Sequence, residues 1–220
     1  FFSTIEFVFE GDQKPSVEQL KAAFEVTALR FGMEWEIHDA NQPARVLIMV
    51  SKYDHCLRDL LYRRATGELN SEISAIVSNH EDLRYLAERE GLDYIHLPVT
   101  KENKPEQEAK LLEIVEQTGT ELVVLARYMQ ILSNDLCQQP SGRAVNIHPP
   151  LLPGFKGATP YHQAHARGGK SIGATAPYVT PDLAEGPILE QSVQPVDHTF
   201  NPDALVAACR ATRNGAPARG

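Results

Sequence analysis

Residues 45–50 have the sequence Arg-Val-Leu-Ile-Met-Val, and residues 121–126 have the sequence Glu-Leu-Val-Val-Leu-Ala. Short apolar runs of this kind are typical of central strands in a parallel sheet, whose two faces are both covered by helices. Parallel strands need a crossover connection, which is usually a helix. The two runs therefore predict an α/β fold with a mostly parallel sheet.

The segments around these runs alternate between strand patterns and helix patterns, as expected for that fold. Strands are expected at residues 46–50, 73–77, 95–98, 121–126, 145–148, 172–179 and 188–193. Helices are expected at residues 57–64, 80–90, 105–117 and 161–167. The helix at 105–117 begins with a proline and is followed by Gly119, which agrees with the residue preferences of helix termini.

The first 40 residues predict a separate, small α+β unit, joined to the rest by a polar linker at residues 39–44. Strands are expected at residues 1–10 and 33–38, because hydrophobic side chains alternate along the first of them. Between them, Ser16 and Gln19 have the spacing of a capping box, and Gly32 can end the helix. Because the chain starts at an apolar run without a methionine, we expect further sequence upstream of residue 1.

The composition excludes several classes of protein. Of 220 residues, 42% are hydrophobic and 23% are charged, as in soluble globular proteins. The sequence has no run of about 20 apolar residues, which a membrane span needs, and its net charge of −8 disfavours nucleic acid as a partner. The start lacks the features of a signal peptide, which predicts a cytoplasmic protein.

The cysteines of the chain, Cys56, Cys137 and Cys209, lack metal-ligand spacing and are expected to be reduced thiols. Residues 210–220 are expected to form an irregular tail.

The strongest local signal for chemistry is Asn146-Ile147-His148, at the end of a predicted strand. Ligands bind beyond the carboxyl ends of strands in open parallel sheets, and residues two apart on a strand project to the same side. An amide can donate to a developing oxyanion, and a histidine can transfer a proton near neutral pH. Alone, the pair is weak evidence for chemistry and favours a structural role, with the asparagine in a turn and the histidine bonded to backbone.

The longer sequence of residues 146–157, Asn-Ile-His-Pro-Pro-Leu-Leu-Pro-Gly-Phe-Lys-Gly, resembles the signature of the formyltetrahydrofolate deformylases, which are 10-formyltetrahydrofolate hydrolases, and of the related formyltransferases. The resemblance implies a Rossmann-like formyltransferase fold, with residues 41–209 as the catalytic domain. Residues 1–40 resemble part of the ACT domain of the deformylases, which makes a homo-oligomer plausible.

The same resemblance implies roles for individual residues. In the catalytic centre, Asn146 would stabilise the oxyanion and His148 would assist proton transfer. The substrate-binding residues would be Arg127, Met129, Gln130, Ile131 and Leu132 in the pterin-lining segment, with Val179 and Thr180 near the folate loop. The folate is the only small molecule implied, because hydrolysis of a formyl group needs no metal or redox cofactor.

The sequence departs from the family pattern at the reacting centre. Pro177 stands where the family has a histidine, and Ala184 stands where it has a catalytic aspartate. Loss of a positioned acid or base commonly lowers a rate by about 10² to 10⁴. We therefore expect this chain to bind the formylated folate and to hydrolyse its formyl group slowly. As Pro177 falls within a predicted strand, an edge or a bulge is expected there.

Three functions remain open. Residues 51–56, Ser-Lys-Tyr-Asp-His-Cys, follow the first sheet strand and contain no glycine, whereas a phosphorylated amine acceptor needs close approach of backbone N–H groups. Water is therefore the expected acceptor, which favours hydrolysis of 10-formyltetrahydrofolate. The alternatives are a glycinamide ribonucleotide formyltransferase-like enzyme and a non-catalytic folate-binding regulator.

Overall fold

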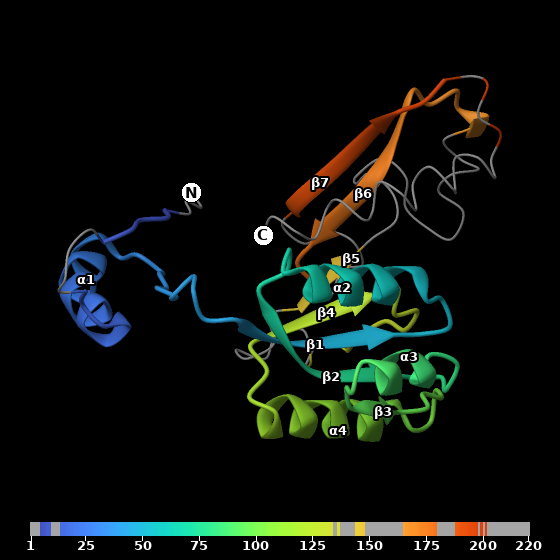
Figure 1. Cartoon of the computed structure of the whole chain (residues 1–220), viewed down its shortest axis with the longest axis horizontal. Coiled ribbons are helices and arrows are strands. Elements are labelled where there is room, and N and C mark those ends of the chain that lie inside the picture. The colour runs from blue at the N-terminus through green and yellow to red at the C-terminus, as the bar shows by residue number, and fades with distance from the viewer. Residues whose placement is uncertain are drawn as a thin grey trace. The chain divides into compact units, whose positions relative to one another are not determined.

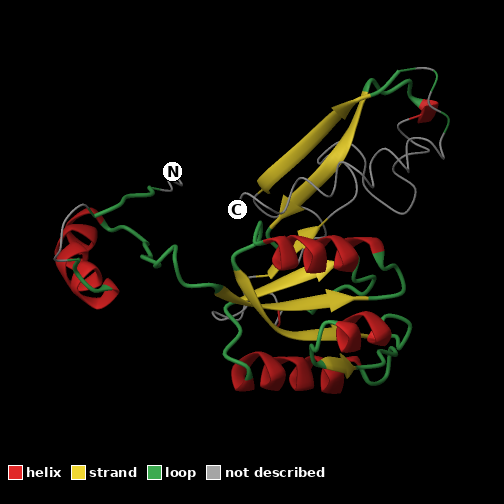
Figure 2. Ribbon diagram, in the orientation of Figure 1, coloured by secondary structure: helices red, strands yellow, loops and turns green. Residues whose placement is uncertain are grey.

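The computed structural model describes residues 5–9, 14–133, 136, 144–147, 165–179, 188–197, 199 and 201. The chain divides into two compact units, Phe1–Gln42 and Pro43–Gly220. The smaller unit contains helix α1, and the larger unit contains the remaining helices and the strands (Figures 1 and 2).

Five parallel strands form the central sheet of the larger unit, and their order is β3-β2-β1-β4-β5. They are β1 (Ala44–Val50), β2 (Ser71–Ser78), β3 (Tyr94–His96), β4 (Leu122–Ala126) and β5 (Ala144–Ile147). The strand order reverses between β1 and β4, which is the point where doubly wound sheets of this order bind ligands. The predicted α/β fold with a mostly parallel sheet is confirmed.

Helices pack on both faces of this sheet, which explains the unbroken apolar runs. Helices α2 (His55–Thr66) and α3 (Arg84–Arg89) cover one face, where Ile48 and Leu57 lie in the same buried cluster. Helix α4 (Lys104–Gln117) covers the other, where Met49 and Leu111 lie in a second cluster. Because neighbouring residues of β1 point to opposite faces, nearly every position of the strand is apolar.

Two further strands, β6 (Ser171–Pro177) and β7 (Ile188–Pro195), form an antiparallel pair. The end of β6 reaches the edge of the central sheet. There Tyr178 forms an antiparallel bridge with Val145, and the Val179 N–H donates to the Ala144 carbonyl over 2.7 Å. The pairing of β6 with β7 shifts register at Pro177, so the bulge expected at this proline is confirmed.

In the smaller unit, α1 (Val17–Phe31) has the predicted start and end. The Ser16 hydroxyl accepts the Gln19 N–H over 3.2 Å, the Gln19 side chain accepts the Ser16 N–H over 2.9 Å, and Gly32 ends the helix in the left-handed region at φ 60°. These contacts confirm the capping box and the C-cap.

Two expected strands of this unit are wrong over the residues described: residues 5–9 and 33–38 are not in strands. The alternation in the sequence is real, but a strand also needs a partner for its backbone groups, and a short pair is barely stable without a packed face. Ile5 and Val8 are indeed exposed. The likeness of this unit to an ACT domain stays a prediction.

The helix predicted at residues 80–90 is shorter, because the residues before it make other bonds. The His80 N–H donates to the Ser78 hydroxyl over 3.1 Å, and the His80 carbonyl accepts the Tyr94 hydroxyl over 2.5 Å. These bonds close the turn after β2, so the helical backbone of α3 begins only at Arg84. Of the helix predicted at residues 161–167, residues 161–164 lie outside the described part, and the next two residues are helical.

Candidate functional site

The carboxyl ends of β1, β2 and β4 are joined by one buried hydrogen-bond network. The Ser51 hydroxyl, just after β1, donates to Asn79 Oδ1 over 2.6 Å and accepts the Met129 N–H over 3.1 Å. Asn79 follows β2, and Met129 belongs to residues 127–133, which we call the β4 exit segment. The network fixes the start of this segment at the point where the strand order reverses.

Sheet register puts Asn146 on the face that α4 covers. Met49 pairs with Leu125 across β1 and β4, and Leu125 pairs with Asn146 across β4 and β5. Side chains that are paired across parallel strands project to the same face. Asn146 thus shares a row with Met49 and Leu125, which belong to the buried cluster under α4.

Pro177 lies beside Asn146 on the same face. Because Val145 is bridged to Tyr178 in antiparallel fashion, the next residue of β5 and the preceding residue of β6 are neighbours with the same orientation. Val179, two residues beyond Pro177, packs against the same buried cluster. The structure thus brings together Asn146, Pro177 and Val179, which the sequence separates by about 30 residues.

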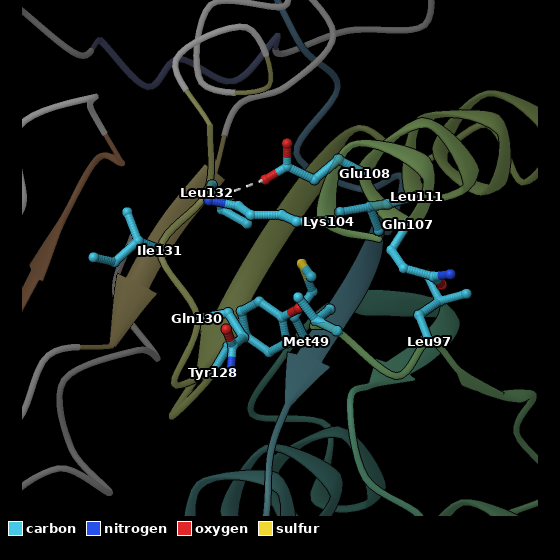
Figure 3. A pocket seen from close by; sticks show the side chains of 11 residues that line it. Met49, Leu97, Lys104, Gln107, Glu108, Leu111, Tyr128, Gln130, Ile131 and Leu132 are labelled. Carbon is cyan, nitrogen blue, oxygen red and sulfur yellow. Dashed lines mark ion pairs between the residues drawn. The ribbon is translucent and has the colours of Figure 1, made fainter. Parts of the chain in front are cut away.

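A pocket lies between α4 and the β4 exit segment (Figure 3). Its apolar residues are Met49, Leu97, Val99, Leu111, Ile131 and Leu132, and its polar residues are Lys104, Gln107, Glu108, Tyr128 and Gln130. Lys104 Nζ is 3.8 Å from Glu108 Oε1, and this oxygen also accepts the Ser133 N–H over 2.8 Å. The cavity volume is about 10 Å³, which is room for about one water molecule, and the lining combines apolar side chains with hydrogen-bonding groups.

Tyr128 is the most strongly perturbed titratable group of this pocket. Burial, with a smaller contribution from the Glu108 carboxylate, raises the pKa of Tyr128 to about 12. Both causes disfavour the phenolate, so the hydroxyl stays protonated at neutral pH and can donate a hydrogen bond.

The turn between β1 and α2 carries an acid where a phosphate-binding loop would present backbone N–H groups. Asp54 precedes α2, and its carboxylate accepts a hydrogen bond from Arg58 over 2.6 Å. This hydrogen bond lowers the pKa of Asp54. The guanidinium of Arg127 lies over the Tyr53 ring, 5.3 Å from its centroid. An ionised carboxylate at this helix end repels a phosphate group.

The predicted site residues fall into three groups. Gln130, Ile131 and Leu132 line the pocket, whereas Arg127 contacts Tyr53, and Met129 is exposed and held by Ser51. Asn146 and Val179 lie on the face of the sheet that α4 covers. His148, Thr180 and Ala184 lie outside the described residues. The predicted pair of Asn146 with His148 therefore stays a prediction.

Sequence reasoning missed the wall that α4 contributes. Lys104, Gln107, Glu108 and Leu111 follow the spacing of one helical face, and this spacing was the available signal. Ser51 and Asn79 carried no comparable signal, because their contact joins residues 28 positions apart.

Among the described residues, no group of three or more histidine, cysteine or carboxylate side chains could hold a metal ion. Within that same part of the chain, none of the helices has the length and apolar character to cross a membrane.

The sequence and the fold both have close relatives among known proteins. Residues 44–215 match the formyl transferase family model. A formyltetrahydrofolate deformylase from Corynebacterium sp. (strain P-1) is 51% identical over 203 residues, which are 92% of this chain and 71% of the relative. The one from Bacillus subtilis (strain 168) is 45% identical over 93% of this chain and 68% of its own length.

Solved structures agree with these matches. The formyltetrahydrofolate deformylase of Burkholderia mallei superposes with a TM-score of 0.82 at 53% identity, over 90% of this chain and 71% of that one. The phosphoribosylglycinamide formyltransferase of Coxiella burnetii is more distant, with a TM-score of 0.72 at 25% identity over 79% of this chain and 83% of its own. The chain therefore belongs to the formyl transferase family, among its formyltetrahydrofolate deformylases.

Proposed function

We propose that this chain hydrolyses 10-formyltetrahydrofolate to formate and tetrahydrofolate. The observation that carries the proposal is the shared row of Met49 and Asn146, since it places a hydrogen-bonding amide on the same face of the sheet as a pocket-lining residue. In this proposal the pterin ring binds against the lining of the pocket, and Asn146 would then meet the formyl group near the edge of the sheet. The names of the relatives agree with this substrate.

The reaction needs a positioned water and a donor for the oxyanion. Water attacks the formyl carbon as one of its protons passes to His148, and a tetrahedral intermediate forms whose negative oxygen accepts a hydrogen bond from the Asn146 amide. The carbon–nitrogen bond then breaks as His148 returns this proton to the folate nitrogen, and the product leaves as formate after releasing the second water proton to solvent. No electrons are transferred, so the proposal includes no redox cofactor, and it assigns no step to a metal.

We further propose that hydrolysis by this chain is slow. Pro177 lies beside Asn146 and offers no side chain that can transfer a proton. Ala184 likewise provides no carboxylate at the position of the family's aspartate. The expected loss is about 10² to 10⁴ in rate.

Water is favoured over a phosphorylated amine because of the turn after β1. Residues 51–54 contain no glycine, and the Asp54 carboxylate is kept ionised by Arg58 at the start of α2. The phosphate of glycinamide ribonucleotide would meet this charge. A formyltransferase remains the second candidate because of the structural likeness to such an enzyme.

The decisive experiment measures formate release from 10-formyltetrahydrofolate, with and without glycinamide ribonucleotide. The proposal expects formate at a rate that the ribonucleotide does not change, and no formylated ribonucleotide. Formylated ribonucleotide as the main product would contradict it in favour of the transferase. Tight binding of the folate without any turnover over long incubation would support the third candidate, a non-catalytic regulator.

We also infer that residues 1–40 are part of an ACT-like domain, that the chain forms homo-oligomers, and that it acts in cytoplasmic one-carbon metabolism that supplies purine biosynthesis. The apolar and exposed Val26, Leu29 and Phe31 of α1 offer a surface for such assembly. Sedimentation at several protein concentrations tests the assembly, and a monomer throughout would contradict it.

A further inference from the structure

The β4 exit segment is attached to the protein body by two side chains, one near each end. At the start, the Met129 N–H donates to the Ser51 hydroxyl over 3.1 Å. At the end, the Ser133 N–H donates to Glu108 Oε1 over 2.8 Å. Gln130, Ile131 and Leu132 lie between the two attachments and line the pocket.

Both anchoring side chains are themselves held in place. Ser51 is only 2% exposed, and its hydroxyl is oriented by donating to Asn79 Oδ1 over 2.6 Å. Glu108 is mostly buried on α4, and Lys104 stands 3.8 Å from the same carboxylate oxygen that accepts the Ser133 N–H. Because Ser51 and Glu108 are each held by a partner of their own, they tie the backbone of the β4 exit segment to the sheet and to α4.

The segment has reason to need such anchors. Arg127 enters it with φ 62°, a left-handed conformation that is unfavourable for a residue with a side chain. Met129 and Ile131 are 57% and 60% exposed, so burial of their side chains does little to hold them. Figure 3 shows Ile131 pointing away from the side chains of α4.

We propose that Ser51 and Glu108 are positioning residues that hold the β4 exit segment in the position required for folate binding. The inference rests on the proposed function for its ligand, but its physical core is the attachment of the Met129 and Ser133 N–H groups. Neither side chain needs to touch the reacting atoms. Their removal is expected to weaken substrate binding and to leave the chemical step nearly unchanged.

The test uses Ser51→Ala and Glu108→Ala in the full chain, with Ser74→Ala as the matched control. Ser74 also makes a hydroxyl hydrogen bond, 2.7 Å from the Thr120 hydroxyl, but it lies near the opposite ends of the strands. Three quantities are measured for each variant: amide hydrogen exchange at Met129 and Ser133, KM and kcat for formate release, and the Kd of tetrahydrofolate.

We expect Ser51→Ala to accelerate exchange at Met129, and Glu108→Ala to accelerate exchange at Ser133. Each should raise KM and Kd by roughly tenfold, the equivalent of about one lost hydrogen bond, with kcat within about threefold of the parent value. Ser74→Ala should change none of these. Glu108→Gln keeps an acceptor oxygen and should retain more affinity than Glu108→Ala.

The outcomes separate this inference from the proposed function. If the parent chain neither binds nor hydrolyses the folate, the proposed function is wrong, and the exchange data alone decide whether the two side chains anchor the segment. If the parent is active and both alanine variants keep the parent exchange rates and KM, the positioning role is wrong. If Ser51→Ala, Glu108→Ala and Ser74→Ala all raise exchange by the same amount, at Met129 and Ser133 as elsewhere in the chain, the positioning role is also wrong. Should Ser51→Ala fail to fold, Glu108→Ala on α4 decides.

Discussion

Pro177 and Asn146 are neighbours across the antiparallel step between β6 and β5, and both side chains face the side of the sheet that α4 covers. A proline in this position adds no polar group to the amide beside it. Because the resemblance puts a histidine of the family at this position, the pair supports the proposal that hydrolysis by this chain is slow.

The double variant Pro177→His/Ala184→Asp should raise formate release by about 10² to 10⁴, because it supplies a proton-transferring group beside Asn146 and the missing carboxylate. The rate of formate release checks this. Pro195→His, at the far end of β7, is the control for replacing a proline by histidine. A double variant within twofold of the parent rate would show that these two positions do not limit the reaction.

The single substitution Pro177→His should lower the stability of the folded chain. Pro177 is less than 2% exposed, so its replacement buries an imidazole. Unless that ring finds a hydrogen-bond partner, the free energy of unfolding should fall by about 1–3 kcal/mol. Urea denaturation of Pro177→His checks this, and an unchanged midpoint would indicate that the imidazole is fully hydrogen-bonded.

Asn146→Ala should lower kcat by about 10² to 10³, as loss of one oxyanion donor does in other enzymes. Its KM should change little, because the donor acts mainly on the transition state. Single-turnover measurements of formate release are suited to the slow rate that we propose for the parent. Asn41→Ala removes an exposed amide that bonds only to nearby Asp39 among the contacts described, and serves as the control. Equal rates for Asn146→Ala and the parent would remove Asn146 from the mechanism.

Tyr128 should make the fold sensitive to strongly alkaline pH. Its pKa is raised to about 12 in the folded chain against 10 in the unfolded chain, so only the unfolded state loses the proton between these values. The stabilisation is therefore complete below pH 10 and is lost as the pH rises towards 12, by about 3 kcal/mol in total. Denaturation at pH 9 and pH 11.5 should show a smaller pH effect in Tyr128→Phe than in the parent. The same loss in both proteins would contradict the assignment.

Core packing predicts a contrast between two leucines. Leu57 of α2 is fully buried, whereas Leu29 of α1 is 76% exposed. Leu57→Ala should lower the free energy of unfolding by about 2–5 kcal/mol, because it leaves a cavity against β1. Leu29→Ala should change it by less than about 0.5 kcal/mol at protein concentrations where the chain is a monomer. Thermal and urea denaturation measure both effects, and similar values for the two would contradict this picture of the core.

The strands of the sheet were predictable because burial on both faces makes them apolar at nearly every position, as residues 45–50 show. The strand order was not, since β1 and β4 pair across more than 70 residues and nothing local marks β1 as central. The exact start of α3 depends on a bond from Tyr94 to the His80 carbonyl, a contact that spacing cannot reveal.

The candidate site was predictable only where a motif marked it. Asn146 was found from its place at the end of a predicted strand and the β4 exit segment through a resemblance, whereas Ser51 and Glu108 act through single contacts to backbone N–H groups. Such contacts depend on tertiary packing, so the sequence gives no period or spacing that identifies them.

The floor of the pocket has little freedom to change. Met49, which lines it, is 1% exposed and packs between strands that carry the rest of the core. A substitution that reshapes this floor therefore weakens the whole domain, and new ligand preferences can arise at low cost only through the rim, where Gln130, Ile131 and Lys104 meet solvent. If this protein diverged towards other substrates, we expect the substitutions that change its ligand preference to occur at those rim positions.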